Sequence, residues 1–454
     1  MELVKSKIDK NQFMMKEFQD AHLNGIVNRW YPLVIDKECG GYFTNISYDW
    51  KILPEQEKMI VSQARHVWTL AKNSEYFGGK EYYDEMAFHG YKFLKQKMWD
   101  DRYGGLYQIR SREGTATDVN GWHDEKRMYG NAFGLYALAA LYDRLHDSDV
   151  LEFAQKIFYW IEEHAFDPTD GGYFEFLTRE GMPFNRSSSY RTISSDRDEV
   201  GFKDQNSSIH LLEAYTELYR VWKDPQLCSR MQSLLELIRD RMVDRRGYLH
   251  LFFQQDWTPV SFCHASEEER TANFGLDHIS FGHDYETAFL MLEASYVLNL
   301  PNDTKTLAVA KTMLDHALAH GFDETVGGFF DGGYYVSSSE HCSIVKETKN
   351  WWAQAESLNA LLLFSKIFPH ESRYHTYFQK EWNYIKKYIL DPVYGDWFEG
   401  GIDKEPHLKK GRKSHMWKCA YHTCRALMNC IAMMNETADA DINHVIAHWR
   451  AISP

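Results

Sequence analysis

Two sets of helical segments alternate along the chain. In both sets apolar residues recur at three- and four-residue spacings, which is typical of helices that bury one face. The first set covers residues 12–30, 81–98, 148–165, 226–243, 303–320 and 372–390. The second set covers residues 62–77, 127–145, 205–222, 283–298, 350–367 and 420–434. The second set is the more apolar, with runs of small and aromatic residues such as "NAFGLYALAALY".

A short motif separates each helix of the first set from the next helix of the second. It consists of an aspartate, a few residues, glycine and then aromatic or other apolar residues, as in "FDPTDGGYFEF" from Phe166 to Phe176. The aspartates stand at positions 36, 100, 167, 244, 323 and 391, so successive copies lie 64 to 79 residues apart. That spacing accommodates two helices and two loops. The chain is therefore predicted to contain six copies of one helix pair.

Six helix pairs can stack in an open array or close into a ring. One pair cannot bury its apolar face alone, so neighbouring pairs must pack together. Polar capping repeats mark an open array, and the ends of this chain show none. We predict an all-α fold, a closed (α/α)6 barrel, with the second set as the inner ring and residues 1–454 as a single domain.

The loops of this barrel are expected to differ at its two ends. A few residues connect each inner helix to the next outer helix, whereas 20 to 35 residues often lie between a motif and the following inner helix. Long loops in a compact domain usually carry function. They should all lie at the mouth where the inner helices begin. Alternating stretches such as "GYLHLFF" predict short β-hairpins there.

Polar and aromatic side chains gather at this mouth, in the first turns of the inner helices. In chain order they are Arg65, Trp68, Arg127, Tyr129, Asn206, His210, His283, Glu286, Trp351, Trp352, Glu356, Trp417 and His422. Pairs such as Asn206 and His210 stand three or four residues apart and share a helix face. We expect these side chains to line one pocket.

The residue types in this pocket suit a sugar. A concave site with aromatic walls and a few polar groups is typical of small-ligand pockets, and tryptophan can cover the apolar C–H face of a sugar ring. Each residue alone also has a structural explanation: most of the 21 histidines will be surface or core groups, and Glu286 can stabilise a helix N-terminus. The recurrence of such residues in six repeats favours the functional interpretation.

A metal site is the alternative for the polar cluster. His210, His283, Glu286 and His422 are all possible ligands. The chain has no HExxH motif or comparable ligand spacing, however. We therefore predict that the protein uses no metal.

Composition narrows the class of protein. The net charge of −14 disfavours nucleic acid as a partner, and the chain has no run of 18 apolar residues that would span a membrane. The polar N-terminus lacks the apolar stretch of a signal peptide. Seven cysteines, an odd number without a CxxC pair, indicate reduced thiols. We expect a cytoplasmic monomer or homodimer with a small-molecule sugar substrate.

Several of these segments resemble a known family. "NSSIHLLEAYTELYRVW", "GHDYETAFLMLEA", "WWAQAE" and "WKCAYH" together resemble the N-acylglucosamine 2-epimerase superfamily, in particular its cellobiose 2-epimerase and mannose 2-epimerase branch. "ARHVWTL" and "YGNAFGLYALA" fit the same branch. The resemblance runs from about residue 30 to 435. It implies an (α/α)6 barrel that inverts carbon 2 of a reducing-end sugar without a cofactor.

The resemblance also implies roles for individual residues. The catalytic histidines would be His283, His422 and His210, of which the first two form the acid/base pair. Arg65 would contact sugar oxygens at the reacting end, and Glu286 would orient His283. The other expected substrate contacts are Tyr129, Asn206, Trp351, Trp352, Glu356 and Trp417.

One segment departs from the cellobiose 2-epimerase pattern. "VSFCHASEEERTANFGLDHISFGHD" is longer than its counterpart and should lie over the pocket mouth, where it would take the space of a second sugar. We therefore predict interconversion of D-mannose and D-glucose, with action on cellobiose or mannose–fructose isomerisation as alternatives. A glycoside hydrolase would use Glu286 and Glu356 as its acid and base, and a sugar-binding module would need no catalyst; both leave the histidines without a role.

Overall fold

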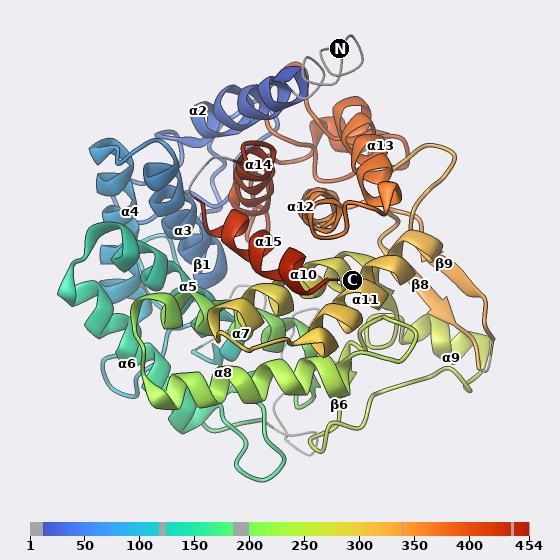
Figure 1. Cartoon of the computed structure of the whole chain (residues 1–454). Coiled ribbons are helices and arrows are strands. Elements are labelled where there is room, and N and C mark those ends of the chain that lie inside the picture. The colour runs from blue at the N-terminus through green and yellow to red at the C-terminus, as the bar shows by residue number, and fades with distance from the viewer. Residues whose placement is uncertain (1–11, 118–123, 185–198, 338, 437–439, 454) are drawn as a thin grey trace.

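The computed structural model of the protein describes residues 12–117, 124–184, 199–337, 339–436 and 440–453 (Figure 1). Six long, almost entirely buried helices form its centre. They are α3 (Ile60–Tyr76), α5 (Met128–Leu145), α7 (Gln205–Val221), α10 (Phe281–Val297), α12 (Trp351–Ile367) and α14 (Tyr421–Met434). Their ends lie within two residues of the predicted inner helices.

The outer layer consists of the six helices of the first set. The first is helical from residue 12 to 30 and includes a π-helical stretch, η1 (Ala21–Val27), and α2 (Asn28–Trp30). The others are α4 (Glu81–Phe93) with η2 (Leu94–Met98), α6 (Ser148–His164), α8 (Pro225–Leu237) with η5 (Ile238–Met242), α11 (Thr304–His320) and α13 (Ser372–Tyr388). On α6, for example, Val150, Phe153, Ile157 and Ile161 form one buried stripe.

Packing between neighbouring inner helices closes the ring. Helix α3 packs on α5, α5 on α7, α7 on α10, α10 on α12 and α12 on α14, and α14 returns to α3. Each inner helix also packs on the outer helix that follows it, and η1 at the N-terminus packs on α14. The predicted (α/α)6 barrel is thus confirmed, and its first outer helix covers its last inner one.

Small residues allow the inner helices to approach closely. In α5, a Cβ atom added at Gly134 would lie 2.3 Å from Leu106 Cδ1, and one at Gly130 would lie 2.6 Å from Ile60 Cγ2. These distances are shorter than a normal carbon–carbon contact. Glycine at these two positions therefore lets α5 pack against α3 and the preceding motif.

Each copy of the aspartate–glycine motif forms a tight hairpin. The residues that flank it form antiparallel bridges in all six copies: Ile35–Tyr42, Trp99–Leu106, Phe166–Tyr173, Val243–Leu249, Phe322–Phe329 and Leu390–Trp397. Asp167 Oδ1 accepts the N–H groups of Thr169 and Asp170, which holds the turn. Gly172 has φ 66°, and a Cβ there would lie 2.2 Å from the Trp257 ring.

Five of the six motif aspartates bind a buried lysine in the segment that leads to the next inner helix. The pairs are Asp36–Lys58 (2.9 Å), Asp100–Lys126 (3.1 Å), Asp167–Lys203 (2.7 Å), Asp323–Lys349 (2.9 Å) and Asp391–Lys413 (2.7 Å). Each lysine also donates to a motif glycine carbonyl, as Lys203 does to Gly171 at 2.9 Å. These pairs fasten the end of each outer helix to the start of an inner one.

The fourth copy lacks this lysine. Ile279 stands two residues before α10, where lysine stands two residues before α3, α5, α7 and α12. Asp244 of this copy lies 3.8 Å from His250 Nε2. The long segment before α10, which contains α9 (Glu267–Ala272), is therefore anchored in a different way from the other five.

Short strands link neighbouring repeats around the mouth. β1 (Lys58–Met59) pairs with β2 (Ile109–Arg110), β3 (Lys126–Arg127) with β4 (Phe176–Leu177), β5 (Lys203–Asp204) with β6 (Phe252–Phe253), and β7 (Ile279–Ser280) with β8 (Gly332–Tyr335), all antiparallel. Strand β8 continues into a hairpin with β9 (Cys342–Lys346). Single bridges, Asn350–Gly400 and Ile46–Ser414, complete the series.

The opposite end of the barrel is covered by α15 (Asp441–Ile452), which packs on α10, α12 and α14 (Figure 1). Trp449 of α15 is fully buried and donates its indole N–H to the Leu292 carbonyl at 3.1 Å. In the described parts of the chain, no helix is both long and apolar enough to cross a membrane. All seven cysteines are unpaired.

Candidate active site

A cavity of about 210 Å³ opens at the mouth, where the inner helices begin. Five of the side chains predicted to gather at this mouth line it: Arg127, Tyr129, Asn206, His283 and Trp417. His278 and Ser280, which directly precede α10, line it as well. The starts of several inner helices thus meet around one concave site.

All three predicted histidines are held through their Nδ1 atoms. The contacts are His210 with Glu213 (2.8 Å), His422 with Glu356 (2.7 Å) and His283 with Ser280 (2.7 Å). A hydrogen bond to one ring nitrogen fixes the orientation of an imidazole. In each case Nε2 remains as the nitrogen that can act on a ligand.

Two of these histidines converge on one aromatic side chain. The ring centroid of Trp352 in α12 lies 4.7 Å from that of His283 in α10 and 5.8 Å from that of His422 in α14. The two histidines come from different helices. The surroundings of Trp352 therefore contain two imidazoles that belong to separate elements.

A charged residue follows each histidine by three positions and so lies one helical turn deeper. These residues are Glu213, Glu286 and Arg425. Arg425 donates from Nη1 to Glu213 and from Nη2 to Glu286 Oε1 at 2.5 Å and Glu356 Oε1 at 2.8 Å. All four groups are buried. One guanidinium therefore joins the carboxylate partners of His210 and His422.

Burial raises the pKa of two of these carboxyl groups. The pKa of Glu286 rises to about 7 through burial and then through repulsion by Glu356. The pKa of Glu356 also rises to about 7 through burial, against the opposing charge of Arg425. Burial likewise disfavours ionised Glu213, but Arg425 and the hydrogen bond from His210 overcome it and lower its pKa to about 2. At neutral pH the cluster therefore holds an ionised Glu213, while burial disfavours ionisation of Glu286 and Glu356.

Burial also keeps His283 and His422 neutral. It lowers the pKa of His283 to about 3, with a smaller contribution from nearby His210. It lowers the pKa of His422 well below the usual range, and the charges of Arg65 and Arg425 act in the same direction. Unprotonated imidazoles can accept a proton from a ligand at neutral pH.

Buried oxygens without a hydrogen-bond partner within the described ranges occur at the site, among them Glu286 Oε2, Glu356 Oε2 and Asn206 Oδ1. Buried polar atoms in proteins are nearly always hydrogen bonded. Acceptors of this kind suit the hydroxyl groups of a polyol. They complement the aromatic wall of Trp352.

Arg65 of α3 supplies a positive charge on the other side of the site. Its Nη2 atom donates to the Tyr129 hydroxyl at 3.0 Å, and its Nη1 atom donates to the Trp417 carbonyl at 3.4 Å. The guanidinium also lies 4.3 Å above the Phe133 ring centroid. These contacts place Arg65 beside Tyr129 and Trp417, two residues that line the cavity.

Two expectations from the sequence need adjustment. Glu286 does not orient His283: its Oε1 binds Arg425, and the hydrogen-bond partner of His283 Nδ1 is the Ser280 hydroxyl. Trp351, the neighbour of Trp352, lies against Lys418, whose Nζ is 5.8 Å from a Trp351 ring centroid. The structure thus brings Trp352 to the histidines and turns Trp351 toward the loop before α14.

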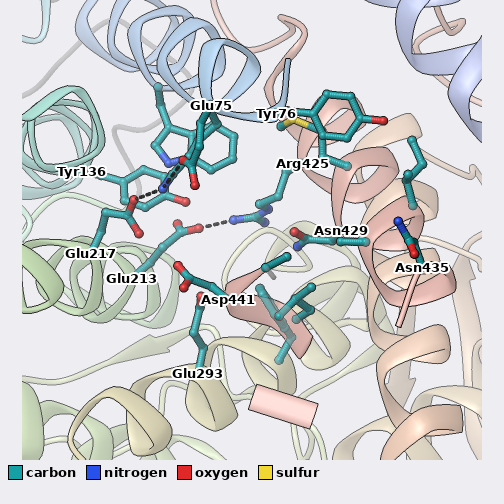
Figure 2. A pocket seen from close by; sticks show the side chains of 18 of the residues that line it. Glu75, Tyr76, Tyr136, Glu213, Glu217, Glu293, Arg425, Asn429, Asn435 and Asp441 are labelled. Carbon is teal, nitrogen blue, oxygen red and sulfur yellow. Dashed lines mark hydrogen bonds and ion pairs between the residues drawn. The ribbon is translucent and has the colours of Figure 1, made fainter. Parts of the chain in front are cut away.

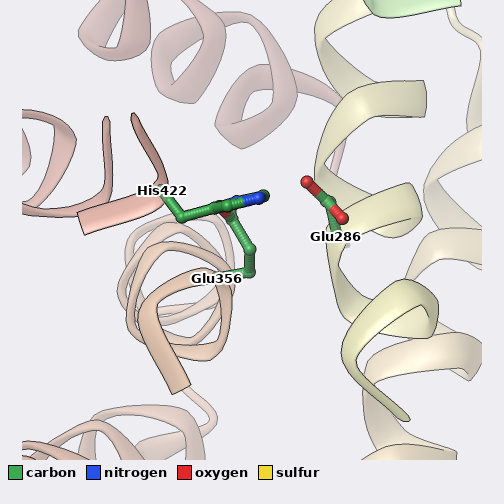
Figure 3. Close-up of side chains that lie close together, drawn as sticks. All are labelled: Glu286, Glu356 and His422. Atoms are coloured by element: carbon green, nitrogen blue, oxygen red, sulfur yellow. The ribbon is translucent and has the colours of Figure 1, made fainter. Parts of the chain in front are cut away.

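Glu286, Glu356 and His422 are close enough together to resemble a metal site (Figure 3). One ligand atom of each lies within 4.8 Å of the other two. Glu286 points from α10 toward the other two side chains. Arg425 already binds both carboxylates and supplies positive charge where a metal ion would. These groups therefore serve as partners of a guanidinium.

A second cavity, of about 480 Å³, lies at the rear end of the barrel (Figure 2). Arg425 and Glu213 form part of its wall, so this cavity borders the same charged cluster on the side opposite the mouth. Its other acidic groups pair with bases: Glu217 lies 2.8 Å from Lys72, and Glu293 lies 2.8 Å from Arg220. His283 lines the cavity at the mouth, which is therefore the candidate active site.

Sequence reasoning missed Glu213, Arg425 and Ser280. A signal for the first two was present, because a charged residue stands three positions after each of the three histidines in "HLLE", "HDYE" and "HTCR". Ser280 stands three positions before His283 but looks like an ordinary helix cap. Only the geometry distinguishes it.

Comparison with known proteins agrees with this architecture. The N-acylglucosamine 2-epimerase (GlcNAc 2-epimerase) family matches residues 41–426. Cellobiose 2-epimerase of Bacteroides fragilis is 28% identical over 94% of this chain and 100% of its own. D-mannose isomerase of Marinomonas mediterranea is 24% identical over 91% of this chain and 96% of its own. The structure of cellobiose 2-epimerase from Bacillus thermoamylovorans superposes with a TM-score of 0.78 at 24% identity, over 92% of this chain and 99% of that one.

Proposed function

The chain belongs to the N-acylglucosamine 2-epimerase family, and from this premise we propose that it is a cofactor-independent sugar 2-epimerase that interconverts D-mannose and D-glucose. Its named relatives are carbohydrate epimerases and isomerases. The observation that carries the proposal is the convergence of His283 and His422 on Trp352. Inversion at one carbon requires proton transfer on two faces, and two histidines from different helices supply it.

The first step is ring opening. The C2 proton becomes acidic only when C1 is a carbonyl, so the O1–H proton must leave, O5 must gain a proton, and the C1–O5 bond must break. A neutral histidine can take the O1 proton and deliver it to O5. His283 is a candidate for this transfer because it is neutral and lines the cavity.

The second step is proton exchange at C2. One histidine removes the C2 proton, which leaves an enediolate. The other histidine, which has taken up a proton from solvent on Nε2, donates it to the opposite face to give the epimer, and solvent then takes the abstracted proton from the first. His283 and His422 are the proposed pair, with His210 and Asn206 beside them. Arg65 would stabilise the oxyanion as charge develops, because a fixed positive group in a buried site acts strongly on it.

The size of the cavity favours a monosaccharide. Its volume of about 210 Å³ is below the range of about 300–1,000 Å³ that is common for drug-sized ligands. Gly275 and His278, from the long segment before α10, form part of its wall. This segment occupies space that a second sugar would need. Action on the reducing end of β-1,4-linked disaccharides such as cellobiose is the alternative that the cellobiose 2-epimerase relatives favour.

A second candidate reaction is isomerisation of mannose to fructose. The D-mannose isomerase relative favours it, and it shares the enediolate with epimerisation. The two reactions differ in the carbon that receives the returning proton, C2 for glucose and C1 for fructose. The same histidines could serve both.

Incubation of D-mannose with the protein in deuterated water tests the proposal. Deuterium at C2 of both glucose and mannose, without fructose, is the expected result. Fructose with deuterium at C1 would establish the isomerase instead. If D-mannose, D-glucose and cellobiose all remain unchanged and unlabelled, the proposed activity is wrong.

The seven unpaired cysteines support the further proposal that the enzyme works in the reducing cytoplasm.

A further inference from the structure

Ser280 occupies the N-cap position of α10, but its side chain does not cap the helix. Serine at this position usually accepts a backbone N–H of the first turn, as the N-cap residue Asp204 of α7 does from Ser207 at 2.7 Å. Helix α10 has no side-chain cap hydrogen bond. The Ser280 hydroxyl instead lies 2.7 Å from His283 Nδ1. The site thus uses this hydroxyl for the imidazole rather than for the helix.

This arrangement sets His283 apart from the other two histidines. Glu213 and Glu356 place a carboxylate on the Nδ1 atoms of His210 and His422. A carboxylate accepts the Nδ1 hydrogen and also stabilises a protonated ring, whereas a hydroxyl accepts it without adding a negative charge. His283 alone is therefore oriented by a neutral group.

The surroundings of His283 also oppose its protonation. His210 on α7 and His278 before α10 carry positive charge when protonated, as does Lys346 on β9, and each disfavours an imidazolium at His283. Trp352 on α12 covers the ring from a further side. A neutral partner at Nδ1 is consistent with this environment.

Ser280 is well placed to hold the ring throughout a reaction cycle. It is buried, and its backbone is fixed by pairing of β7 with Gly332 on β8. It also lines the cavity. Its oxygen can therefore accept the Nδ1 hydrogen while its own O–H donates toward a ligand.

We propose that Ser280 is a positioning residue that fixes His283 as the tautomer with hydrogen on Nδ1 and a free lone pair on Nε2. The inference rests on the proposed function and deepens it. At C2, Nε2 accepts the proton of one epimer, or in the reverse direction donates one to the enediolate, and it exchanges that proton with solvent. The Nδ1 hydrogen stays bonded to Ser280 Oγ throughout, and the serine neither gains nor loses a proton.

Ser280→Ala and Ser280→Thr test the proposal together. Hydrogen-bond partners of metal-bound histidines typically contribute about 10–100-fold, and by analogy we expect kcat for mannose epimerisation to fall by about that factor in the alanine variant. KM should change by less than about threefold, because positioning acts on the chemical step. Threonine keeps the hydroxyl and should restore most of the activity.

Ser62→Ala is the matched control. Ser62 is a buried serine in the first turn of the inner helix α3, and its hydroxyl donates only to the Met59 carbonyl, at 3.1 Å. We expect its kcat to stay near that of the wild type. A Ser280→Ala variant that matches this control in kcat would overturn the proposal.

A readout that is independent of turnover is the nitrogen NMR spectrum of protein with ¹⁵N-labelled histidine rings. The His283 signals can be identified by their loss in His283→Gln. We expect a protonated Nδ1 and an unprotonated Nε2 in the wild type, and a mixture or the reverse in Ser280→Ala. The same tautomer in both proteins would contradict the inference even in the absence of any epimerase activity, so its failure differs from failure of the proposed function.

Discussion

Arg425 Nη2 lies 2.8 Å from Glu356 Oε1, the same oxygen that holds Nδ1 of His422. The guanidinium and the imidazole therefore share one carboxylate oxygen in a buried site. Because Arg425 also binds Glu213, the partner of His210, it links the groups behind two of the three histidines. The protonation of this cluster and the orientation of the histidines are thus set together.

Replacement of this shared carboxylate should reduce turnover. Glu356→Gln keeps the size of the side chain but removes its charge, so it weakens the bonds to both His422 and Arg425. Loss of such a partner typically costs about 10–100-fold in activity, and we expect kcat to fall by that factor. Steady-state kinetics on D-mannose measures it.

Glu381→Gln is the matched control for this variant. Glu381 is another fully buried glutamate, but it lies on the outer helix α13 and away from the histidines. It should retain wild-type kcat. Equal activities in the two glutamine variants would show that Glu356 has no special role.

The histidines themselves should be indispensable. His283→Gln and His422→Gln remove the ring nitrogens that transfer protons, a contribution of about 10²–10⁴-fold. We expect kcat to drop by at least that much while circular dichroism shows an intact helical fold. His316→Gln is the control, since His316 is buried on α11 and bonds the Tyr335 hydroxyl at 3.0 Å. Near-normal epimerisation by either site variant would refute the assignment.

The buried carboxyl group of Glu381 should make the free energy of unfolding depend on pH. Burial raises its pKa from 4.5 to about 8, so between those values the folded protein retains a proton that the unfolded chain has released. Stability contributed by this group therefore falls as pH rises from about 4.5 to about 8. Glu381→Gln has no buried carboxyl group to ionise. Its free energy of unfolding in urea, relative to that of the wild type, should therefore increase between these two pH values. The gain is at most about 5 kcal/mol, and a difference that does not vary with pH would contradict the explanation.

The buried aspartate–lysine pairs should be important for folding. Lys203→Met leaves Asp167 as a buried charge without its main partner, since both side chains are 2% exposed or less. Loss of one member of such a pair costs about 3–5 kcal/mol, which chemical denaturation can measure. Lys305→Met removes one member of an exposed pair with Asp240 and should cost at most about 1 kcal/mol. A similar small loss in both variants would argue against this role.

Release of the segment before α10 should broaden the substrate range. Asp277 Oδ2 accepts hydrogen bonds from Phe262 N–H at 2.5 Å and from the Tyr334 hydroxyl at 2.8 Å, which fastens the segment to the β8–β9 hairpin. In Asp277→Ala we expect kcat/KM for cellobiose to rise relative to that for mannose. A wild-type enzyme that already prefers cellobiose would disprove the monosaccharide proposal.

The local pattern of the sequence was enough for much of the fold. A helix is defined by residues three and four positions apart, so the periodicity located all six inner helices within two residues. The repeated motif located the start of each inner helix, and these starts placed His210, His283 and His422 at one end of the barrel. A further local signal went unused, namely the lysine two residues before α3, α5, α7 and α12.

The tertiary structure alone decided how these residues contact one another. Arg425 reaches Glu286 and Glu213 across 139 and 212 residues of chain, and no periodicity within one helix specifies such partners. The orientation of α12 about its axis brings Trp352, and not Trp351, to the histidines. The turn before α10 brings the Ser280 hydroxyl to His283. The sequence by itself therefore determined the barrel and the location of its polar residues. Only the closed barrel shows which side chains bind one another, because hydrogen bonds and ion pairs depend on the distances between side chains of different helices.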